Sequence, residues 1–120
     1  MKPTEIITED ANRNGVDPAP ILDKIARSVK SGNGIILQSG DTVLVIRKFA
    51  KGLAELHLFT ADEPMAMVKA LREFVRKIQN SDLTAVYGNA DNAQILQVLK
   101  NLGVDVQRSD LPDYNWKALV

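Results

Sequence analysis

The sequence contains no cysteine and only one histidine among its 120 residues. Without cysteine the chain cannot form a disulfide, a thiolate nucleophile or a cysteine-ligated metal site. A single histidine leaves only scattered carboxylates as other metal ligands, so we expect no metal site. The lack of cysteine is also compatible with a reducing compartment.

The chain has no net charge, because 15 basic residues balance 15 acidic ones. Proteins held on nucleic acid mainly by phosphate contacts need a basic excess or a basic patch. We therefore expect no nucleic-acid partner. Zero net charge leaves little repulsion between copies of the chain, which makes a homodimer a reasonable expectation.

Long hydrophobic runs are absent as well. No stretch approaches the roughly 18 to 20 apolar residues that cross a bilayer, and the first ten residues lack the apolar core of a signal peptide. The composition, with 45% hydrophobic and 25% charged residues, is ordinary for a globular protein. We expect a single domain over residues 1–120, no membrane partner and a cytoplasmic location.

The first half of the sequence predicts a strand, a helix and then three strands. Residues 5–8 are β-prone, and residues 9–17 are polar with a turn at Asn14-Gly15. A helix follows, with Asp17 as its cap. Its apolar face is formed by Ile21, Leu22, Ile25, Ala26 and Val29. The three strands are expected at residues 34–38, 42–47 and 53–60. The middle one is apolar enough to be covered on both faces.

The second half predicts two helices that alternate with strands. Residues 62–80 form the longer helix, with Thr60 or Asp62 as its cap. A strand at residues 83–87, a polar turn and a helix ending near Asn101 follow. Two further strands are expected, one that ends at residue 106 and one at residues 114–120. The order β-α-β-β-β-α-β-α-β, with one more strand at the end, predicts an α/β (α+β) fold. Its sheet would be mixed and mostly antiparallel, with helices on both faces.

This order resembles that of the GNAT superfamily, the acyl-CoA N-acyltransferases, over most of the chain. In that family a late helix carries an Asn at its start and ends on Leu-Gly-Phe. Here Asn92, Leu102, Gly103 and Val104 match that spacing, with valine in place of the aromatic residue. The resemblance implies that residues 53–60 are the central strand. The next helix would bind the CoA pyrophosphate at its N-terminus, and the strand at 83–87 would splay away to admit the acyl-pantetheine arm.

The resemblance also implies ligands. The cofactor would be acetyl-CoA or another acyl-CoA, and the acceptor a small amine or a protein amine. The residues that it places at the cofactor are Phe59, Thr60, Ala61, Met65, Asn89 and Asn92. The two asparagines have a structural alternative, because asparagine commonly occupies turns and helix caps.

The phosphate loop departs from the family's pattern. That pattern has Arg or Gln followed by glycines, because glycine lets backbone N–H groups approach the phosphates at a helix N-terminus. Residues 59–65 contain no glycine and no cation. Asp62 and Glu63 would repel a pyrophosphate, and Pro64 lacks an N–H donor. Conventional CoA binding should therefore be weakened.

A second departure concerns the acid that protonates the leaving thiolate. Many members of the family place a tyrosine seven residues after the Asn of the late helix. That position is Leu99 here, which cannot transfer a proton. Tyr87 or Tyr114 could substitute for it, and some members of the family work without a dedicated acid.

Glu55 and His57 are the candidate catalytic pair. The family often uses a carboxylate on the central strand as general base, and histidine is suited to proton transfer near neutral pH. Strand alternation predicts that both side chains lie on one face, about 7 Å apart along the strand. The structural alternative is that both are polar residues of a partly exposed strand face.

Two functions remain open from the sequence. The first is an acyl-CoA-dependent N-acyltransferase-like protein with a degenerate pyrophosphate loop. The second is a non-catalytic protein of GNAT fold with a structural or interaction role, for example a phage or virion component.

Overall fold

The computed structural model of the chain describes residues 1–89 and 93–120. The helices in these ranges are α1 (Pro3–Arg13), α2 (Pro18–Lys30), α3 (Pro64–Gln79) and α4 (Ala93–Asn101). The strands are β1 (Gly34–Ser39), β2 (Thr42–Ala50), β3 (Leu53–Thr60), β4 (Ala85–Gly88), β5 (Asp105–Arg108) and β6 (Trp116–Leu119). Asn92 lies outside the described residues, so its role at a cofactor stays a prediction.

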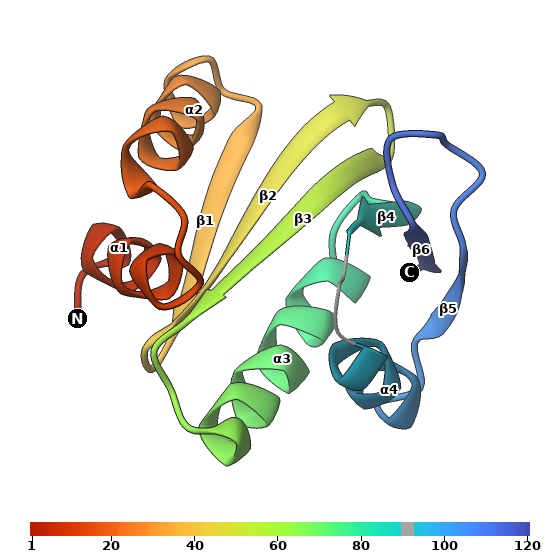
Figure 1. Ribbon diagram of the computed structural model, residues 1–120. Coiled ribbons are helices and arrows are strands. Elements are labelled where there is room, and N and C mark those ends of the chain that lie inside the picture. The colour runs from red at the N-terminus through yellow and green to blue at the C-terminus, as the bar shows by residue number, and fades with distance from the viewer. Residues whose placement is uncertain (90–92) are drawn as a thin grey trace.

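Within the described ranges, six strands form one sheet in the order β1-β2-β3-β4-β6-β5 (Figure 1). β3 and β4 are parallel, and the other neighbouring pairs are antiparallel. The predicted mixed, mostly antiparallel sheet is therefore confirmed. The last strand, β6, lies between β4 and β5 instead of at an edge. It is hydrogen-bonded to β4 on one side and to the edge strand β5 on the other.

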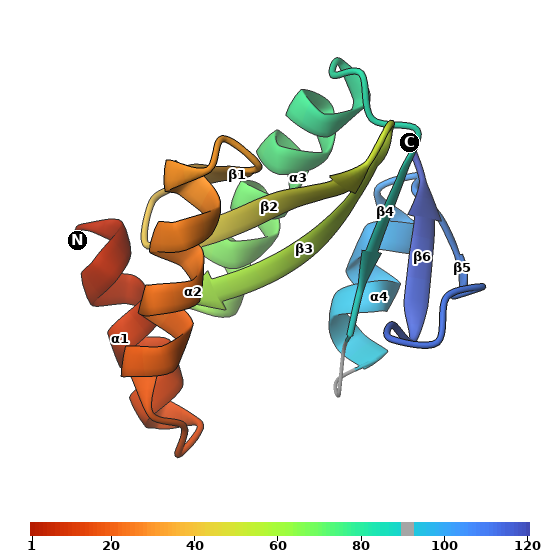
Figure 2. The ribbon, with the colours of Figure 1, turned by 90° about the horizontal axis from the view of Figure 1, so that it is seen from above.

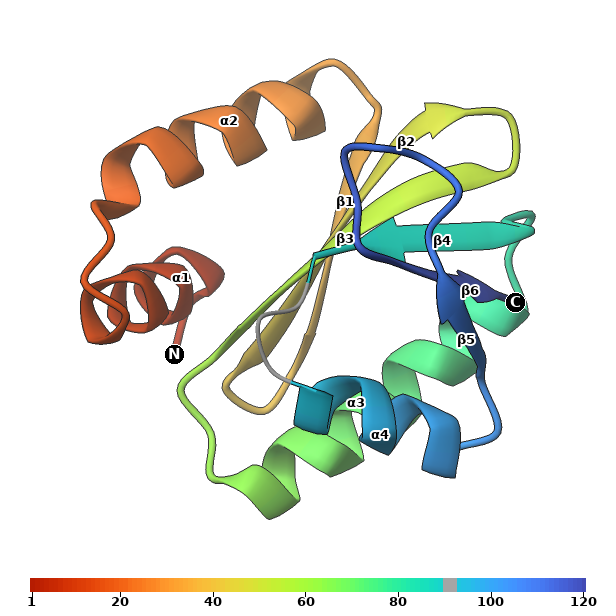
Figure 3. The same ribbon diagram turned by 45° about the vertical axis from the view of Figure 1, so that its right-hand side comes forward.

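The helices cover both faces of the sheet, as predicted (Figure 3). α1 and α2 pack on one face, over a core that contains Ile6, Ile7, Val43 and Val45. α3 and α4 pack on the other face, over a larger core. That core includes Leu44, Ile46, Ala54, Phe74, Val86 and Leu99. Because residues of β2 alternate between the two cores, the first five are all buried, and the expected two-sided cover of this strand is confirmed.

The strand predicted at residues 5–8 is wrong, because these residues belong to α1. The β-branched pair Ile6-Ile7 favours a strand on propensity alone. Ala11, four residues after Ile7, completes a buried helical face. Pro3 occupies the start of the helix, and the Glu5 carboxylate accepts a hydrogen bond from the Lys2 N–H at 2.9 Å. The sheet accordingly begins with β1, and α1 precedes α2 directly.

The start of α3 also differs from the prediction. Its N-cap is Glu63, so neither Thr60 nor Asp62 caps it. The Asp62 carboxylate instead accepts hydrogen bonds from the Asp41 N–H at 2.9 Å and the Thr42 hydroxyl at 2.7 Å. These bonds tie the β3–α3 connection to the β1–β2 turn. In the described part of the chain, no helix has the length and apolar character to cross a membrane.

β3 and β4 start side by side and then part, as Figure 2 shows. Their pairing covers three residues of each strand and ends at Glu55 and Tyr87. β3 continues to Thr60 against β2, whereas β4 ends at Gly88 and pairs along its whole length with β6. The second half of β3 is therefore open on its β4 side, so the predicted splay is present.

Trp116 of β6 packs closely at the point where the strands part. Its indole lies against Gly88, and a Cβ added there would come within 2.6 Å of Trp116 Cζ2. Trp116 is itself buried. A side chain at position 88 therefore does not fit unless the indole moves.

We expect Gly88→Ala to destabilise the fold by about 1–3 kcal/mol, because the added methyl overlaps the Trp116 ring. Urea denaturation of the two proteins measures the difference. The matched control is the same substitution in a Trp116→Leu background, where the overlapping ring is absent. There Gly88→Ala should cost clearly less, so strictly additive effects would contradict the proposed overlap.

Candidate functional site

A cavity of about 400 Å³ opens where β3 and β4 part. Its walls come mainly from β3, α3 and α4 and are largely apolar. Leu56, Leu71, Phe74, Ile95, Leu99 and Trp116 are among the apolar lining residues. Polar groups are contributed by Asp10, Asn14, His57, Thr60 and Asn89. The volume falls in the range of about 300–1,000 Å³ that is typical of small-molecule sites.

The backbone of β3 also faces this opening. The Ala61 N–H donates to the Asp41 carbonyl at 2.9 Å, which makes the neighbouring pair of Thr42 and Thr60 a non-hydrogen-bonded one. Alternate residues of β3 then direct their N–H and C=O groups away from β2, and Leu58 is one of them. Because β4 has already parted from β3, Leu58 presents both peptide groups to the cavity.

Glu55 is buried at the edge of this region and has three partners. Its Oε1 accepts a hydrogen bond from Arg47 Nε at 2.5 Å and lies 3.3 Å from His57 Nε2. Its Oε2 accepts a hydrogen bond from Tyr114 Oη at 2.5 Å. Glu55 and His57 therefore share a face of the strand, as alternation predicts, and their side chains meet.

These partners determine the protonation of Glu55. Burial raises the pKa of Glu55, but hydrogen bonds from Arg47, Tyr114 and His57 outweigh burial and lower the pKa to about 2. Burial and the bond to Glu55 raise the pKa of Tyr114 to about 12. At neutral pH Glu55 is a carboxylate and Tyr114 a phenol. A general base works best when its pKa lies near the working pH, so this environment makes Glu55 a weak proton acceptor.

His57 is better placed to exchange a proton. Its side chain is 49% exposed, lines the cavity and contacts the Glu55 carboxylate. Imidazole is the side chain that most readily gains or loses a proton near neutral pH. Of the expected catalytic pair, the geometry favours His57 as the acceptor and Glu55 as its positioning residue.

Arg47 and Tyr114 belong to this site as partners of Glu55, which sequence reasoning missed, since it considered Tyr114 only as a substitute acid for the leaving group. A two-residue turn at Lys51-Gly52 would pair Lys48 with Glu55. The ladder instead shifts between Lys48 and Ala50, which brings Arg47 opposite Glu55. Tyr114 comes from the loop before β6, far along the chain. The only sequence signal for either was a charged residue in an otherwise apolar strand, at Arg47.

The residues that follow Glu55 across the neighbouring strands of the sheet are also polar. Tyr87 pairs with Glu55 and then with Lys117. The Tyr87 hydroxyl donates to Asp110 Oδ1 at 2.9 Å, and Lys117 Nζ lies 3.5 Å from the same oxygen. The Tyr87 ring also packs against Phe49, at 5.8 Å between centroids. Tyr87 and Tyr114 thus both donate hydrogen bonds to carboxylates of this polar row, by which we mean Arg47, Glu55, Tyr87 and Lys117 on adjacent strands with their partners Asp110 and Tyr114.

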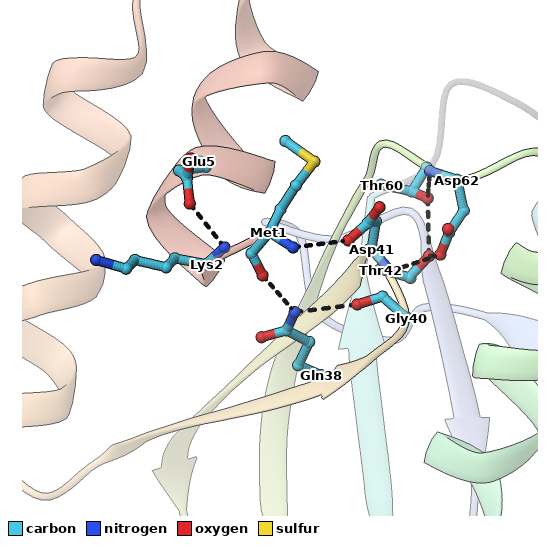
Figure 4. Close-up of polar contacts among 9 residues, drawn as sticks. All are labelled: Met1, Lys2, Glu5, Gln38, Gly40, Asp41, Thr42, Thr60 and Asp62. Atoms are coloured by element: carbon cyan, nitrogen blue, oxygen red, sulfur yellow. Dashed lines mark hydrogen bonds and ion pairs between the residues drawn. The ribbon is translucent and has the colours of Figure 1, made fainter.

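In the expected phosphate loop, residues 59–65, backbone N–H groups already donate to acceptors within the protein. The Thr60 N–H donates to Asp10 Oδ2 at 2.9 Å, and the Ala61 N–H to the Asp41 carbonyl at 2.9 Å. The Asp62 N–H donates to Thr60 Oγ1 at 3.0 Å. Figure 4 shows how Thr60 and Asp62 gather around the turn at Asp41. Three consecutive backbone donors of the loop are therefore already engaged.

The other residues expected at the cofactor are distributed unevenly. Phe59 lines the cavity and packs against the core under α1 and α2. Met65 is 87% exposed on the first turn of α3. Asn89 lines the cavity, but its Nδ2 donates to the Asp113 carbonyl at 3.0 Å and its Oδ1 accepts from the Asn115 N–H at 2.8 Å. This geometry favours the structural alternative for Asn89.

Leu99 lines the cavity where the resemblance expects an acid. The two tyrosines considered as substitutes do not line it within the described ranges. Their hydroxyls donate to Asp110 and Glu55 in the polar row instead. A leaving group in the cavity would therefore receive its proton from solvent or from His57.

Solved structures that are similar to this chain include acetyltransferases. An IAA acetyltransferase from Bacillus cereus matches with a TM-score of 0.57 and 13% identity, over 98% of this chain and 89% of its own. A ribosomal-protein-alanine N-acetyltransferase from Brucella melitensis matches with a TM-score of 0.54 and 13% identity, over 87% and 76%. The chain has a GNAT-like fold.

A third similar structure is the microcin C7 self-immunity acetyltransferase MccE, solved in complex with acetyl-CoA and AMP. It matches with a TM-score of 0.52 and 8% identity, over 84% of this chain and 67% of its own. No protein-family model and no curated protein matches the sequence. Identities this low establish the GNAT-like fold alone, so the chemistry has to be argued from this chain's own residues.

The lowered pKa of Glu55 predicts a pH-dependent contribution to the stability of this GNAT-like fold. With an ordinary pKa of 4.5 and a folded-state pKa of about 2, the carboxylate stabilises the fold above pH 4.5, and this contribution is lost as the pH falls to 2. Over that interval we expect the wild type to lose on the order of 2 kcal/mol more than Glu55→Gln.

Urea denaturation at several pH values tests this expectation. Glu73→Gln, which alters an exposed carboxyl of α3, is the matched control and should follow the wild type. An equal loss of stability in Glu55→Gln and wild type would show that another group is responsible for the acid dependence.

Proposed function

We propose that the protein is an N-acyltransferase that takes its acyl group from a thioester of the acyl-CoA class and passes it to an amine. The observation that carries the proposal is the position of His57. It lies on the wall of a cavity that opens where the two parallel strands part. This arrangement brings a proton acceptor next to a space for an extended ligand.

The cavity suits the acyl-pantetheine arm of such a donor. Its largely apolar walls would take the acyl group and the methylene chain. The exposed peptide groups of Leu58 would hydrogen-bond the amide groups of the arm, much as a neighbouring strand would. Acetyl-CoA is the simplest probe of this donor class.

In the proposed reaction, the amine nitrogen attacks the thioester carbonyl carbon, the C–N bond forms and the C–S bond breaks. The proton lost by the nitrogen passes to His57, and the carboxylate of Glu55 stabilises the imidazolium. The thiolate leaves and is protonated by the imidazolium or by solvent, since Leu99 has no proton to give. The acceptor, a small amine or a protein amine, would approach from the exposed side of His57.

The second candidate is a non-catalytic protein of GNAT-like fold with a structural or interaction role, such as a virion component. The closed loop favours it, because the N–H groups of Thr60, Ala61 and Asp62 already have partners. Binding of a thioester separates the two candidates, and turnover with an amine decides for the first. A wild type that binds no thioester would leave only the second.

We expect His57→Gln to lower the rate of acyl transfer by about 10²- to 10⁴-fold, the usual contribution of general base catalysis. Donor affinity should change little, because glutamine keeps a polar side chain of similar length. Thiol release from acetyl-CoA with a panel of amines gives the rate, and calorimetry gives the affinity. Retained turnover would remove His57 as the proton acceptor.

Filling the cavity tests the donor site independently of the proton transfer. Ile95 of α4 lines the cavity and is half-buried. We expect Ile95→Trp to weaken donor binding at least about tenfold, because the larger ring occupies the space for the arm. Circular dichroism and urea denaturation should show a folded protein. Unchanged donor affinity in the folded variant would place the donor elsewhere.

A further inference from the structure

We infer that the cavity is built for an acylated pantetheine arm without a nucleotide diphosphate, so that acyl-CoA is a poorer donor than its pantetheine part alone. This inference rests on the function proposed above and names the chemical class of its donor. It follows from the contacts of the β3–α3 loop, at the end of the cavity where the diphosphate of CoA would lie.

The Asp10 carboxylate occupies the anion position of this loop. Its Oδ2 accepts the Thr60 N–H at 2.9 Å, and its Oδ1 accepts a hydrogen bond from Asn14 Nδ2 at 3.1 Å. All three residues line the cavity. A diphosphate bound to the Thr60 N–H would have to displace a carboxylate that is fixed on both oxygens.

Two further donors of the loop are engaged, and the first turn of α3, whose N–H groups have no side-chain cap, is flanked by acidic residues. Ala61 and Asp62 direct their N–H groups to the protein's own oxygens. Pro64 has no N–H, and Glu63 places a further carboxylate at the N-terminus of α3. A diphosphate here would find fewer backbone donors than at a glycine-rich loop, and those of the first turn, such as the Met65 N–H, lie beside the Glu63 carboxylate.

The charges around the cavity also disfavour a diphosphate. Asp10 is a carboxylate on the cavity wall, and Asp62 adds a second one two residues after Thr60, whose N–H donates to Asp10. No lysine or arginine lines the cavity within residues 1–89 and 93–120. A neutral amide-containing arm meets no such repulsion, and the peptide groups of Leu58 are available to it. The cavity therefore discriminates against the nucleotide end of CoA and accepts the arm.

The first test compares the affinities of the wild type for S-acetyl-pantetheine and acetyl-CoA, by calorimetry at one ionic strength. We expect S-acetyl-pantetheine to bind at least as tightly as acetyl-CoA. Tighter binding of acetyl-CoA than of S-acetyl-pantetheine, as expected where a diphosphate is well recognised, would overturn the inference and leave the proposed acyltransferase standing. Binding of neither thioester would remove the proposed function and the inference with it.

The second test asks whether Asp10 causes the discrimination. Asp10→Ala should tighten acetyl-CoA binding about three- to tenfold, because it removes a negative charge and frees the Thr60 N–H. S-acetyl-pantetheine affinity should stay unchanged. Asp10→Asn, which keeps an acceptor for the Thr60 N–H, should give a smaller gain and serves if the alanine variant fails to fold.

Glu9→Gln is the matched control, because it removes a charge from the adjacent, solvent-facing position of α1, where Glu9 pairs with Arg13 at 3.8 Å. It should alter neither affinity. Equal changes for both thioesters in the Asp10 variants, or the same gain in Glu9→Gln, would show that Asp10 does not select against the diphosphate. S-acetyl-4′-phosphopantetheine carries one phosphate and no nucleotide, so it tests whether a single phosphate is tolerated. If it binds more tightly than acetyl-CoA, the discrimination is directed at the nucleotide diphosphate, which supports the inference.

Discussion

The parting of β3 from β4 is the constraint on which the site depends. β4 has only four residues and pairs with β6 over all of them, whereas its pairing with β3 ends at Tyr87. Trp116 packs against Gly88 at the point where the strands diverge and forms part of the cavity wall. β3 thus keeps one hydrogen-bonded neighbour for its second half. The cavity, the exposed peptide groups of Leu58 and the position of His57 all follow from that geometry.

The buried carboxylate of Glu55 organises the other side of the site. A buried charge is tolerated only when partners compensate for its desolvation. Here Arg47, Tyr114 and His57 do so, and they come from β2, β3 and the loop before β6. The same contacts that make the burial tolerable lower the basicity of Glu55. The residue expected as the base is therefore better suited to hold and polarise its histidine neighbour.

Most of the elements could be predicted from local patterns. Asp17 caps α2 through the Ala19 N–H, as predicted, and β1 to β3 lie close to their predicted bounds. The exception is α1, where Ile6-Ile7 indicated a strand and the helical partner Ala11 was overlooked. The sequence also showed that residues 59–65 contain no glycine and no cation. Local rules identified the face shared by Glu55 and His57, because alternation along one strand needs no tertiary information.

The sequence alone determined the fold class, the absence of cysteine chemistry and the apolar character of Leu99, since these depend on composition and on spacings of a few residues. Only the tertiary structure decided which residues complete the site. The irregular pairing near Phe49 sets Arg47 opposite Glu55, and Asp10 reaches Thr60 across 50 positions of the chain. Register and long-range contacts of this kind result from the packing of whole elements against one another, which no local propensity records.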